Sequence, residues 1–297
     1  MEQHCTQCPR NCGIDRINGT IGYCGAPWDF VVSRASLHQW EEPSLSGTRG
    51  SGTVFFSGCN LRCVFCQNRD VSHTLVGKRL SPNELAALML RLQDAGAHNI
   101  NLVTPTPYAI QLAEVLQAVK PSLHIPVVYN CGGYESVEAL KHLDGLVDVY
   151  LPDCKYHSAE LATRYSDAPD YFAVATKAID EMLRQVGKPQ LDRDGMIQRG
   201  MILRHLVLPS HRSDSEALLS ALADLFGTDA FLLSLISQYT PEFAKSCPYP
   251  ALCRRVTSFE YDRVLTHAQK LGFEGYFQAR QSASADYTPN FNDTGLL

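Results

Sequence analysis

The sequence is most informative at Gly58-Cys59-Asn60-Leu61-Arg62-Cys63-Val64-Phe65-Cys66-Gln67-Asn68. It holds three cysteines, Cys59, Cys63 and Cys66, in the spacing C-x3-C-x2-C, and it follows the apolar run 53–56. That run is short and rich in β-branched and aromatic residues, which predicts a buried strand. The cysteines are therefore expected on a loop that leaves a strand end, where a rigid scaffold presents metal ligands.

Three soft thiolates this close together suit an iron–sulfur cluster. A [4Fe–4S] cluster has four irons, so three cysteines leave one iron open to a small molecule. A zinc knuckle and a coincidence of buried thiols are the alternatives. Zinc sites usually close with four ligands, and no fourth cysteine or histidine follows at short range. The spacing therefore favours an iron–sulfur cluster.

With Phe65 directly before the third cysteine, this loop resembles the signature of the radical S-adenosylmethionine (SAM) superfamily. The resemblance implies that Cys59, Cys63 and Cys66 hold a [4Fe–4S] cluster whose fourth iron is chelated by the amino and carboxylate groups of SAM. One electron would cleave SAM to methionine and a 5′-deoxyadenosyl radical, which abstracts a hydrogen atom. The resemblance also implies a flavodoxin or ferredoxin as the low-potential electron donor.

The composition is that of an ordinary globular chain. Its 297 residues are 45% apolar and 19% charged, enough for one α/β barrel or two modest domains. A net charge of −5 without a basic arm argues against nucleic acid as a partner. We expect no membrane span and no signal peptide. Eleven cysteines then indicate metal and redox chemistry in a reducing cytoplasm.

A second cysteine group, made of Cys5, Cys8, Cys12 and Cys24, lies in the first 30 residues. Glycines are frequent around it, and the segment is too small to have its own core. A metal that staples the segment is the main hypothesis, with zinc slightly favoured over a second iron–sulfur cluster. Unpaired structural cysteines are the remaining alternative.

From residue 53 the pattern alternates strand and helix six times, which predicts a parallel sheet with right-handed crossovers. The expected strands are 53–56, 99–103, 125–129, 147–151, 200–207 and 231–236, and the expected helices are 81–94, 108–119, 137–143, 159–186, 213–226 and 259–271. The resemblance implies an α/β fold of the partial (β/α)6 barrel type. The expected divisions are a cysteine-rich module (1–30), a connecting segment (31–52), the barrel (53–281) and a tail (282–297).

Polar residues follow every predicted strand, at the edge where barrel enzymes gather their active groups. After the second strand, Thr106 stands where the superfamily commonly has a glutamate that receives the SAM amino group. A hydroxyl brings no charge, so backbone carbonyls are an alternative for that contact. A turn stiffened by proline is the structural alternative.

The fourth and fifth strands end with charged residues. The pair Asp153 and Lys155 resembles a motif of glycyl-radical-enzyme activases that lies beside the methionine end of SAM. Arg204 interrupts an apolar run, and a buried charge must be paired or face a ligand. The activases have a matching arginine that faces SAM. Asp153, Lys155 and Arg204 are therefore the candidate catalytic residues.

We expect SAM to be bound by groups on the cluster loop and at the strand ends. The candidates are Phe65, Asn68, Thr104, Thr106, Asn130, Asp153, Lys155, Arg204 and Gln238. Tyr239 is a further candidate by position. Cys131, Cys154, Cys247 and Cys253 are expected to be small buried apolar residues, although Cys247 and Cys253 could also hold an auxiliary metal.

The chain resembles the PflX-type branch, which is similar to the pyruvate formate-lyase activating enzyme. The matching segments are 8–12, 58–68, 99–106, 150–156, 204–209 and 238–241. The expected activity is reductive SAM cleavage with hydrogen abstraction from an unidentified substrate. A small molecule is mildly favoured over a protein glycine, because the N-terminal module is a candidate lid. A non-catalytic iron–sulfur electron-transfer protein is the rival, but it would not explain Asp153, Lys155 and Arg204.

Overall fold

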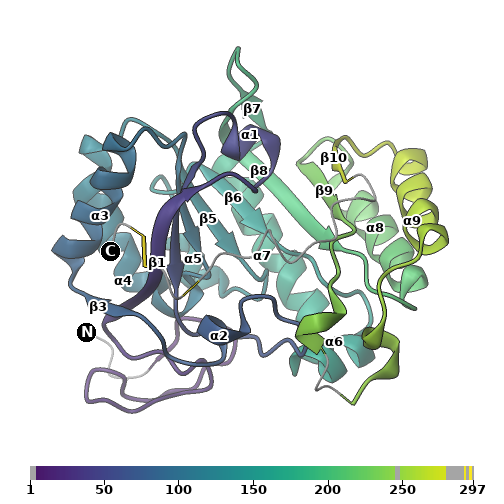
Figure 1. Ribbon diagram of the computed structural model, residues 1–297, viewed down its shortest axis with the longest axis horizontal. Helices are drawn as coiled ribbons and strands as arrows, with labels where there is room; N and C mark the ends of the chain where they lie inside the picture. The colour runs from purple at the N-terminus through teal and green to yellow at the C-terminus, as the bar shows by residue number, and fades with distance from the viewer. Residues whose placement is uncertain (1–4, 245–247, 279–290, 292–293, 296–297) are drawn as a thin grey trace.

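A twisted, open sheet runs through the computed structural model of the chain, with helices packed along it (Figure 1). The structure describes residues 5–244, 248–278, 291 and 294–295. The strand order is β10-β9-β8-β6-β5-β4-β2-β1-β3, and β7 pairs with β8 beside this path. The strands are β1 (Phe30–His38), β2 (Ser51–Phe56), β3 (Lys78–Leu80), β4 (Ile100–Val103), β5 (Val127–Cys131), β6 (Val149–Pro152), β7 (Gln190–Leu191), β8 (Ile197–Leu206), β9 (Leu232–Ile236) and β10 (Gly275–Phe277).

Helices follow most of the parallel strands, as βαβ crossovers require. They are α1 (Pro43–Ser46), α2 (Arg69–Ser72), α3 (Pro82–Asp94), α4 (Ala109–Val119), α5 (Val137–Lys141), α6 (Ala159–Ser166), α7 (Tyr171–Val186), α8 (Arg212–Phe226) and α9 (Ser258–Leu271). Short 3-10 turns lie at Thr106–Tyr108, Lys120–Ser122, Pro241–Ala244 and Pro250–Cys253.

The six predicted strands pair in parallel, in the order β2, β4, β5, β6, β8 and β9, so the prediction of an α/β partial barrel is confirmed. The sheet does not close. β10 adds a seventh parallel strand, and β1 and β3 add an antiparallel edge. β10 was not predicted, because its three residues follow a glycine-containing turn and carry no periodic pattern.

Local signals placed α3 well. Ser81 caps the helix through the Glu84 backbone, and the Glu84 carboxylate receives the Ser81 N–H in return, as a capping box does. The long helix expected over 159–186 is two helices instead. Asp167 adopts a left-handed backbone (φ 50°) after α6, and Pro169 follows it, so the first helix ends there.

The strands are buried on both faces, as parallel strands between two layers are. Side chains of the main core, such as Tyr129 on β5, pack against the helices. Their neighbours point the other way, and Val128, Leu151 and Ile202 enclose Leu45 of α1. Figure 1 shows α1 at one end of the strands and α2 near the opposite end. α1 therefore fills the concave side of the sheet at the N-terminal ends of the parallel strands.

The first described residues, 5–29, contain no helix or strand and lie against the barrel. Two arginines fasten this segment to distant parts of the chain. Arg10 donates to the carbonyls of Asn60, Ser166 and Asp167. Arg16 is buried and donates to the carbonyl of Pro107. Among the residues the structure describes, no helix has the length and apolar character needed to cross a membrane.

Candidate active site

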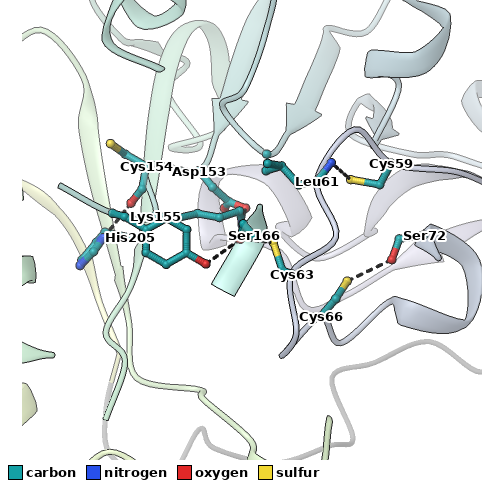
Figure 2. Close-up of polar contacts among 12 residues, drawn as sticks. Cys59, Leu61, Cys63, Cys66, Ser72, Asp153, Cys154, Lys155, Ser166 and His205 are labelled. Atoms are coloured by element: carbon teal, nitrogen blue, oxygen red, sulfur yellow. Dashed lines mark hydrogen bonds and ion pairs between the residues drawn. The ribbon is translucent and has the colours of Figure 1, made fainter. Parts of the chain in front are cut away.

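The three-cysteine loop leaves the C-terminal end of β2 and is held by hydrogen bonds to each sulfur. The Leu61 N–H donates to Cys59 Sγ (3.3 Å), and the Ser166 hydroxyl donates to Cys63 Sγ (2.9 Å). Cys66 Sγ lies 3.2 Å from the Ser72 hydroxyl. Figure 2 shows the three cysteines along one loop, with Lys155 approaching from the side of the sheet. Donors aimed at sulfur suit thiolate ligands.

A group of buried tyrosines packs against this loop. Tyr156, Tyr165 and Tyr171 are almost fully buried and belong to the same apolar cluster as Cys63 and Phe65. The Tyr156 hydroxyl lies 2.7 Å from the Ser166 hydroxyl, which in turn bonds Cys63. The hydrogen-bond chain thus runs from these tyrosines to a sulfur of the loop.

A cavity of about 350 Å³ opens beside the loop, and Cys59, Cys63 and Cys66 all line it. Burial raises the pKa of the Cys59 thiol and raises that of Cys66 to about 11. A buried thiolate needs a compensating positive charge, which bound iron supplies. Three soft donors beside one cavity, each with a hydrogen-bond partner, fit a [4Fe–4S] cluster.

Asp153 and Lys155 follow β6 and lie on the cavity wall as an ion pair. The turn after β5 fixes their backbone: Gly133 has a left-handed backbone (φ 78°), and a Cβ there would lie 2.0 Å from the Asp153 carbonyl oxygen. The Tyr171 hydroxyl lies 2.8 Å from the Gly132 carbonyl and accepts the Lys155 N–H at 3.1 Å. Burial opposes the charge on Lys155, but the Asp153 carboxylate and the Cys63 thiol raise its pKa above the ordinary value.

Arg204 also lines the cavity, and its guanidinium is engaged by two carboxylates. Nε and Nη2 grip Glu42 at 2.7 and 2.6 Å, and Nη2 also bonds Glu41. Burial disfavours the charge on Glu42, but Arg204 holds the pKa of that carboxyl below its ordinary value. The predicted arginine is therefore at the cavity, with its charge already paired to residues that precede α1.

The other predicted SAM-binding residues divide into two groups. Those that line the cavity are Phe65, Asn68, Thr104, Asn130 and Gln238. Thr106 does not line it. Its hydroxyl is buried and donates to Glu135 Oε1 at 2.8 Å. Tyr239 is buried as well and donates to the Leu252 carbonyl, and β5 extends to Cys131, so Asn130 lies within the strand and not after it.

Sequence reasoning missed Glu41 and Glu42, together with their neighbours His38 and Trp40, which all line the same cavity. The expected connecting segment 31–52 turned out to contribute part of the wall. Two adjacent acids before Pro43 were the available signal, but such a pair also fits an exposed surface loop. His205, by contrast, does not line the cavity, and its Nε2 lies 2.8 Å from the Ser215 hydroxyl of α8.

The second cysteine group lies directly against the cluster loop. The Cys59 N–H donates to the Cys24 carbonyl at 3.3 Å, and a Cβ on Gly58 would lie 2.8 Å from that oxygen. Within the described residues, no three His, Cys, Asp or Glu side chains are grouped so as to hold a single metal ion. Burial raises the pKa of Cys8 to about 12, and burial also raises that of Cys24, which Arg16 opposes.

Among the remaining cysteines, Cys131 and Cys154 are buried, as expected of small apolar residues. Cys131 also lines the cavity. Cys253 is exposed, which corrects the expectation of burial: it ends a short 3-10 turn on the surface. Cys247, and most of the expected tail 282–297, lie outside the described residues.

Comparisons with known proteins agree with this geometry. The sequence profile of the radical SAM superfamily matches residues 53–194. An uncharacterized protein of Methanocaldococcus jannaschii is 30% identical over 282 residues, which are 92% of this chain and 76% of that protein. The pyruvate formate-lyase-activating enzyme of Clostridium pasteurianum is 32% identical over 118 residues, covering 36% of this chain and 49% of that enzyme.

Solved structures share the fold. SuiB of Streptococcus suis, bound to its precursor peptide SuiA, superposes with a TM-score of 0.52 at 11% identity over 74% of this chain. The structure of SuiB bound to SAM gives a TM-score of 0.50 at 9% identity. This chain covers 46% and 48% of the two SuiB chains, so it corresponds to about half of that protein.

Proposed function

This chain belongs to the radical SAM superfamily, and we propose that it is an enzyme that cleaves SAM reductively and abstracts hydrogen from a substrate bound in the cavity. A [4Fe–4S] cluster with one open iron supplies the electron for this cleavage when it is bound. The observation that carries the proposal is that all three motif cysteines, Asp153, Lys155 and Arg204 line one cavity.

The residues around the loop have distinct roles in this proposal. Cys59, Cys63 and Cys66 are the cluster ligands. The Asp153–Lys155 pair, which Tyr171 orients through the backbone, offers both signs of charge to the zwitterionic methionine end of SAM. Phe65, Asn68, Thr104, Asn130 and Gln238 form the rest of the SAM wall. In this proposal Arg204 reaches the cavity with its guanidinium already paired to Glu42, so it does not offer SAM an unpaired positive charge.

Two substrate classes are compatible with the fold. The partial match to the pyruvate formate-lyase-activating enzyme favours the PflX-type branch and activation of a protein glycine, and SuiB holds a peptide. We favour a small molecule, because Glu41, Glu42 and Pro43 line one side of the cavity, which has a volume of about 350 Å³, and Leu45 of α1 packs into the concave side of the sheet. A flavodoxin or ferredoxin in the cytoplasm is the proposed electron donor.

Although Cys5, Cys8, Cys12 and Cys24 are not grouped around a single ion among the described residues, we also propose that they hold a metal centre, either zinc or a second iron–sulfur cluster. Arg16 supports this proposal: it is buried, it lies 3.9 Å from Cys5 Sγ, and its described partners are carbonyls and that sulfur, without an acidic side chain. A centre with four thiolates carries negative charge, which a buried arginine complements.

The test is anaerobic reconstitution of the full chain with iron and sulfide, followed by reduction, addition of SAM, and assay of 5′-deoxyadenosine. The proposal predicts the nucleoside in the wild type and a SAM affinity that falls in Lys155→Met with the iron content unchanged. A loaded cluster that yields no nucleoside with any reductant would support the electron-transfer alternative. The zinc and iron content per chain assigns the N-terminal centre.

A further inference from the structure

The cavity that holds the candidate active site has an excess of negative charge. Its titratable lining residues, apart from the cysteines and Tyr276, are His38, Glu41, Glu42, Asp153, Lys155 and Arg204. Asp153 forms an ion pair with Lys155, and Nε and Nη2 of Arg204 both donate to the Glu42 carboxylate. Glu41 shares one nitrogen of the same arginine. Three carboxylates therefore face two bases, and burial lowers the pKa of His38, which keeps it neutral.

This imbalance is buried, which makes it chemically significant. The side chains of Glu41 and Glu42 are 8% and 5% exposed, and that of Arg204 is 16% exposed. A carboxylate removed from water without a full partner is costly, and proteins retain such groups where a ligand completes the pairing. The proposed cofactors would not correct this balance, because a [4Fe–4S] cluster with three thiolate ligands carries a net negative charge that cancels the net positive charge of SAM.

A second observation beside Glu41 also points to a missing donor. The Asn101 side chain is fully buried, and its Nδ2 donates to Glu41 Oε1 at 3.0 Å. Its Oδ1 has no hydrogen-bond partner among the described residues. Since the two amide atoms share one carbon, this acceptor lies within a few ångströms of the Glu41 carboxylate. Together they accept hydrogen bonds and supply negative charge, as an ammonium or guanidinium group requires.

The neighbouring cavity wall suits the apolar part of an organic cation. Trp40 directly precedes Glu41 in the chain and lines the same cavity, although its side chain is 60% exposed. Phe55 and Tyr276 add aromatic surface. Aromatic faces attract organic cations more than neutral molecules of the same shape.

We propose that Glu41, which lines the cavity and is held by the Asn101 side chain, binds a positively charged amine or guanidine of the substrate. This inference rests on the proposed function and deepens it: the substrate class is an organic cation, and Glu41 is a specificity-determining residue. Glu42 has the separate task of holding Arg204 at the cavity wall.

The first test measures binding alone, so it is independent of SAM cleavage. The reconstituted protein with SAM is dialysed to equilibrium against labelled n-butylammonium, n-butanol or n-butyrate. The proposal predicts saturable binding of the cation, at least about tenfold tighter than that of the alcohol, and exclusion of the anion. Equal binding of the three probes, or no saturable binding of the cation, would overturn it. This arm uses only the wild type.

The second test uses variants. Glu41→Gln keeps the shape and removes the charge, so the preference for the cation over the alcohol should fall about tenfold or more, while Glu41→Asp should retain most of it. Glu138→Gln is the matched control, because Glu138 is an exposed acid that pairs with Lys141 on α5. A preference that survives Glu41→Gln in folded protein would contradict the assignment.

The source of the cation is distinguished by a further pair of probes. Agmatine represents a small-molecule substrate, and an acetylated Gly-Lys-Gly amide represents a lysine in a protein segment. Binding of either one with the Glu41 dependence supports the cation site, and their relative affinity identifies the source. If neither probe binds although 5′-deoxyadenosine is formed, this inference fails while the proposed function stands.

Discussion

The two cysteine groups touch through one backbone hydrogen bond but face different surroundings. The first group lines a cavity, and Lys155 is the cation that opposes the burial of its thiols. The second group has Arg16 on one side, while the carboxyl of Glu135 adds to the burial that raises the pKa of Cys8. The cysteines of the first group therefore lie beside a cavity and an ion-paired lysine, and those of the second group lie beside a buried arginine.

This difference suggests a division of labour. The first loop follows β2, a strand whose residues are all buried. This rigid strand fixes the positions of the sulfurs beside the cavity. The second group sits in a segment without helices or strands among its described residues, fastened by arginines to carbonyls. We infer that the first group carries the chemistry and that the second stabilises the segment covering it.

The largest expected effect is on SAM cleavage. Cys63→Ala should remove a cluster ligand and abolish both the cluster absorbance and formation of 5′-deoxyadenosine, because no other described cysteine lies at that point of the loop. Cys131→Ala is the matched control, since Cys131 is also buried and lines the same cavity outside the motif. If cleavage persists in Cys63→Ala, or is lost equally in Cys131→Ala, the motif cysteines have no special role compared with another cysteine of the cavity.

The next largest effect is on the stability of the segment that carries the second cysteine group. Arg16→Met leaves the carbonyls of Ala26, Pro27 and Pro107 without their donor. Buried acceptors without partners cost about 1–3 kcal/mol each, so the free energy of unfolding should fall by roughly 3–5 kcal/mol in chemical denaturation. Arg79→Met, which breaks only an exposed ion pair with Asp29, should change it by less than about 0.5 kcal/mol. Similar losses in both variants would contradict the role of Arg16.

The third effect is a pH dependence of the free energy of unfolding that comes from Glu135, whose charge acts on Cys8 of the second group. Burial raises the pKa of Glu135 from 4.5 to about 7, against the hydrogen bonds from Thr106 and Tyr129. A raised pKa in the folded state favours folding below pH 4.5, and this contribution is lost as the pH rises through 7. Relative to Glu135→Gln, the wild type should lose up to about 3 kcal/mol between pH 4.5 and 8. Parallel stability curves for the two proteins would rule this out.

The smallest effect concerns the hydrogen bond to the first group. Ser166→Ala removes the donor to Cys63 Sγ, and such a bond stabilises the more negative, reduced cluster. A hydrogen bond worth about 1 kcal/mol corresponds to about 40 mV for one electron. The reduction potential should therefore become more negative by about that amount in a redox titration followed by electron paramagnetic resonance. Tyr156→Phe should shift it in the same direction by less, and a positive shift would contradict the argument.

Local sequence signals predicted the parts of the fold that local physics controls. The helix expected from residue 81, the alternation of strands and helices and the loop of Cys59, Cys63 and Cys66 all depend on short patterns. Asp153 was expected near the active site because it follows a parallel strand, and it does line the cavity. These features could be predicted because neighbours in the chain determine them.

The parts that failed depend on contacts between distant residues. Glu41 and Glu42 look like loop acids in the sequence, and only the position of Arg204, more than 160 residues away, makes them part of the site. Thr106 has the right position in the chain, but Glu135 draws its hydroxyl into the core. No periodicity reports such pairings, so a single sequence leaves them open.

The central claim is that the first cysteine group, and not the second, presents an open iron to SAM. Its most direct test is the electron paramagnetic resonance spectrum of the reduced protein before and after addition of SAM, in the wild type, in Cys63→Ala and in a Cys8→Ser/Cys24→Ser double variant. We expect a SAM-dependent change of the spectrum in the wild type and in the double variant, and none in Cys63→Ala. A change that survives in Cys63→Ala and disappears in the double variant would contradict it.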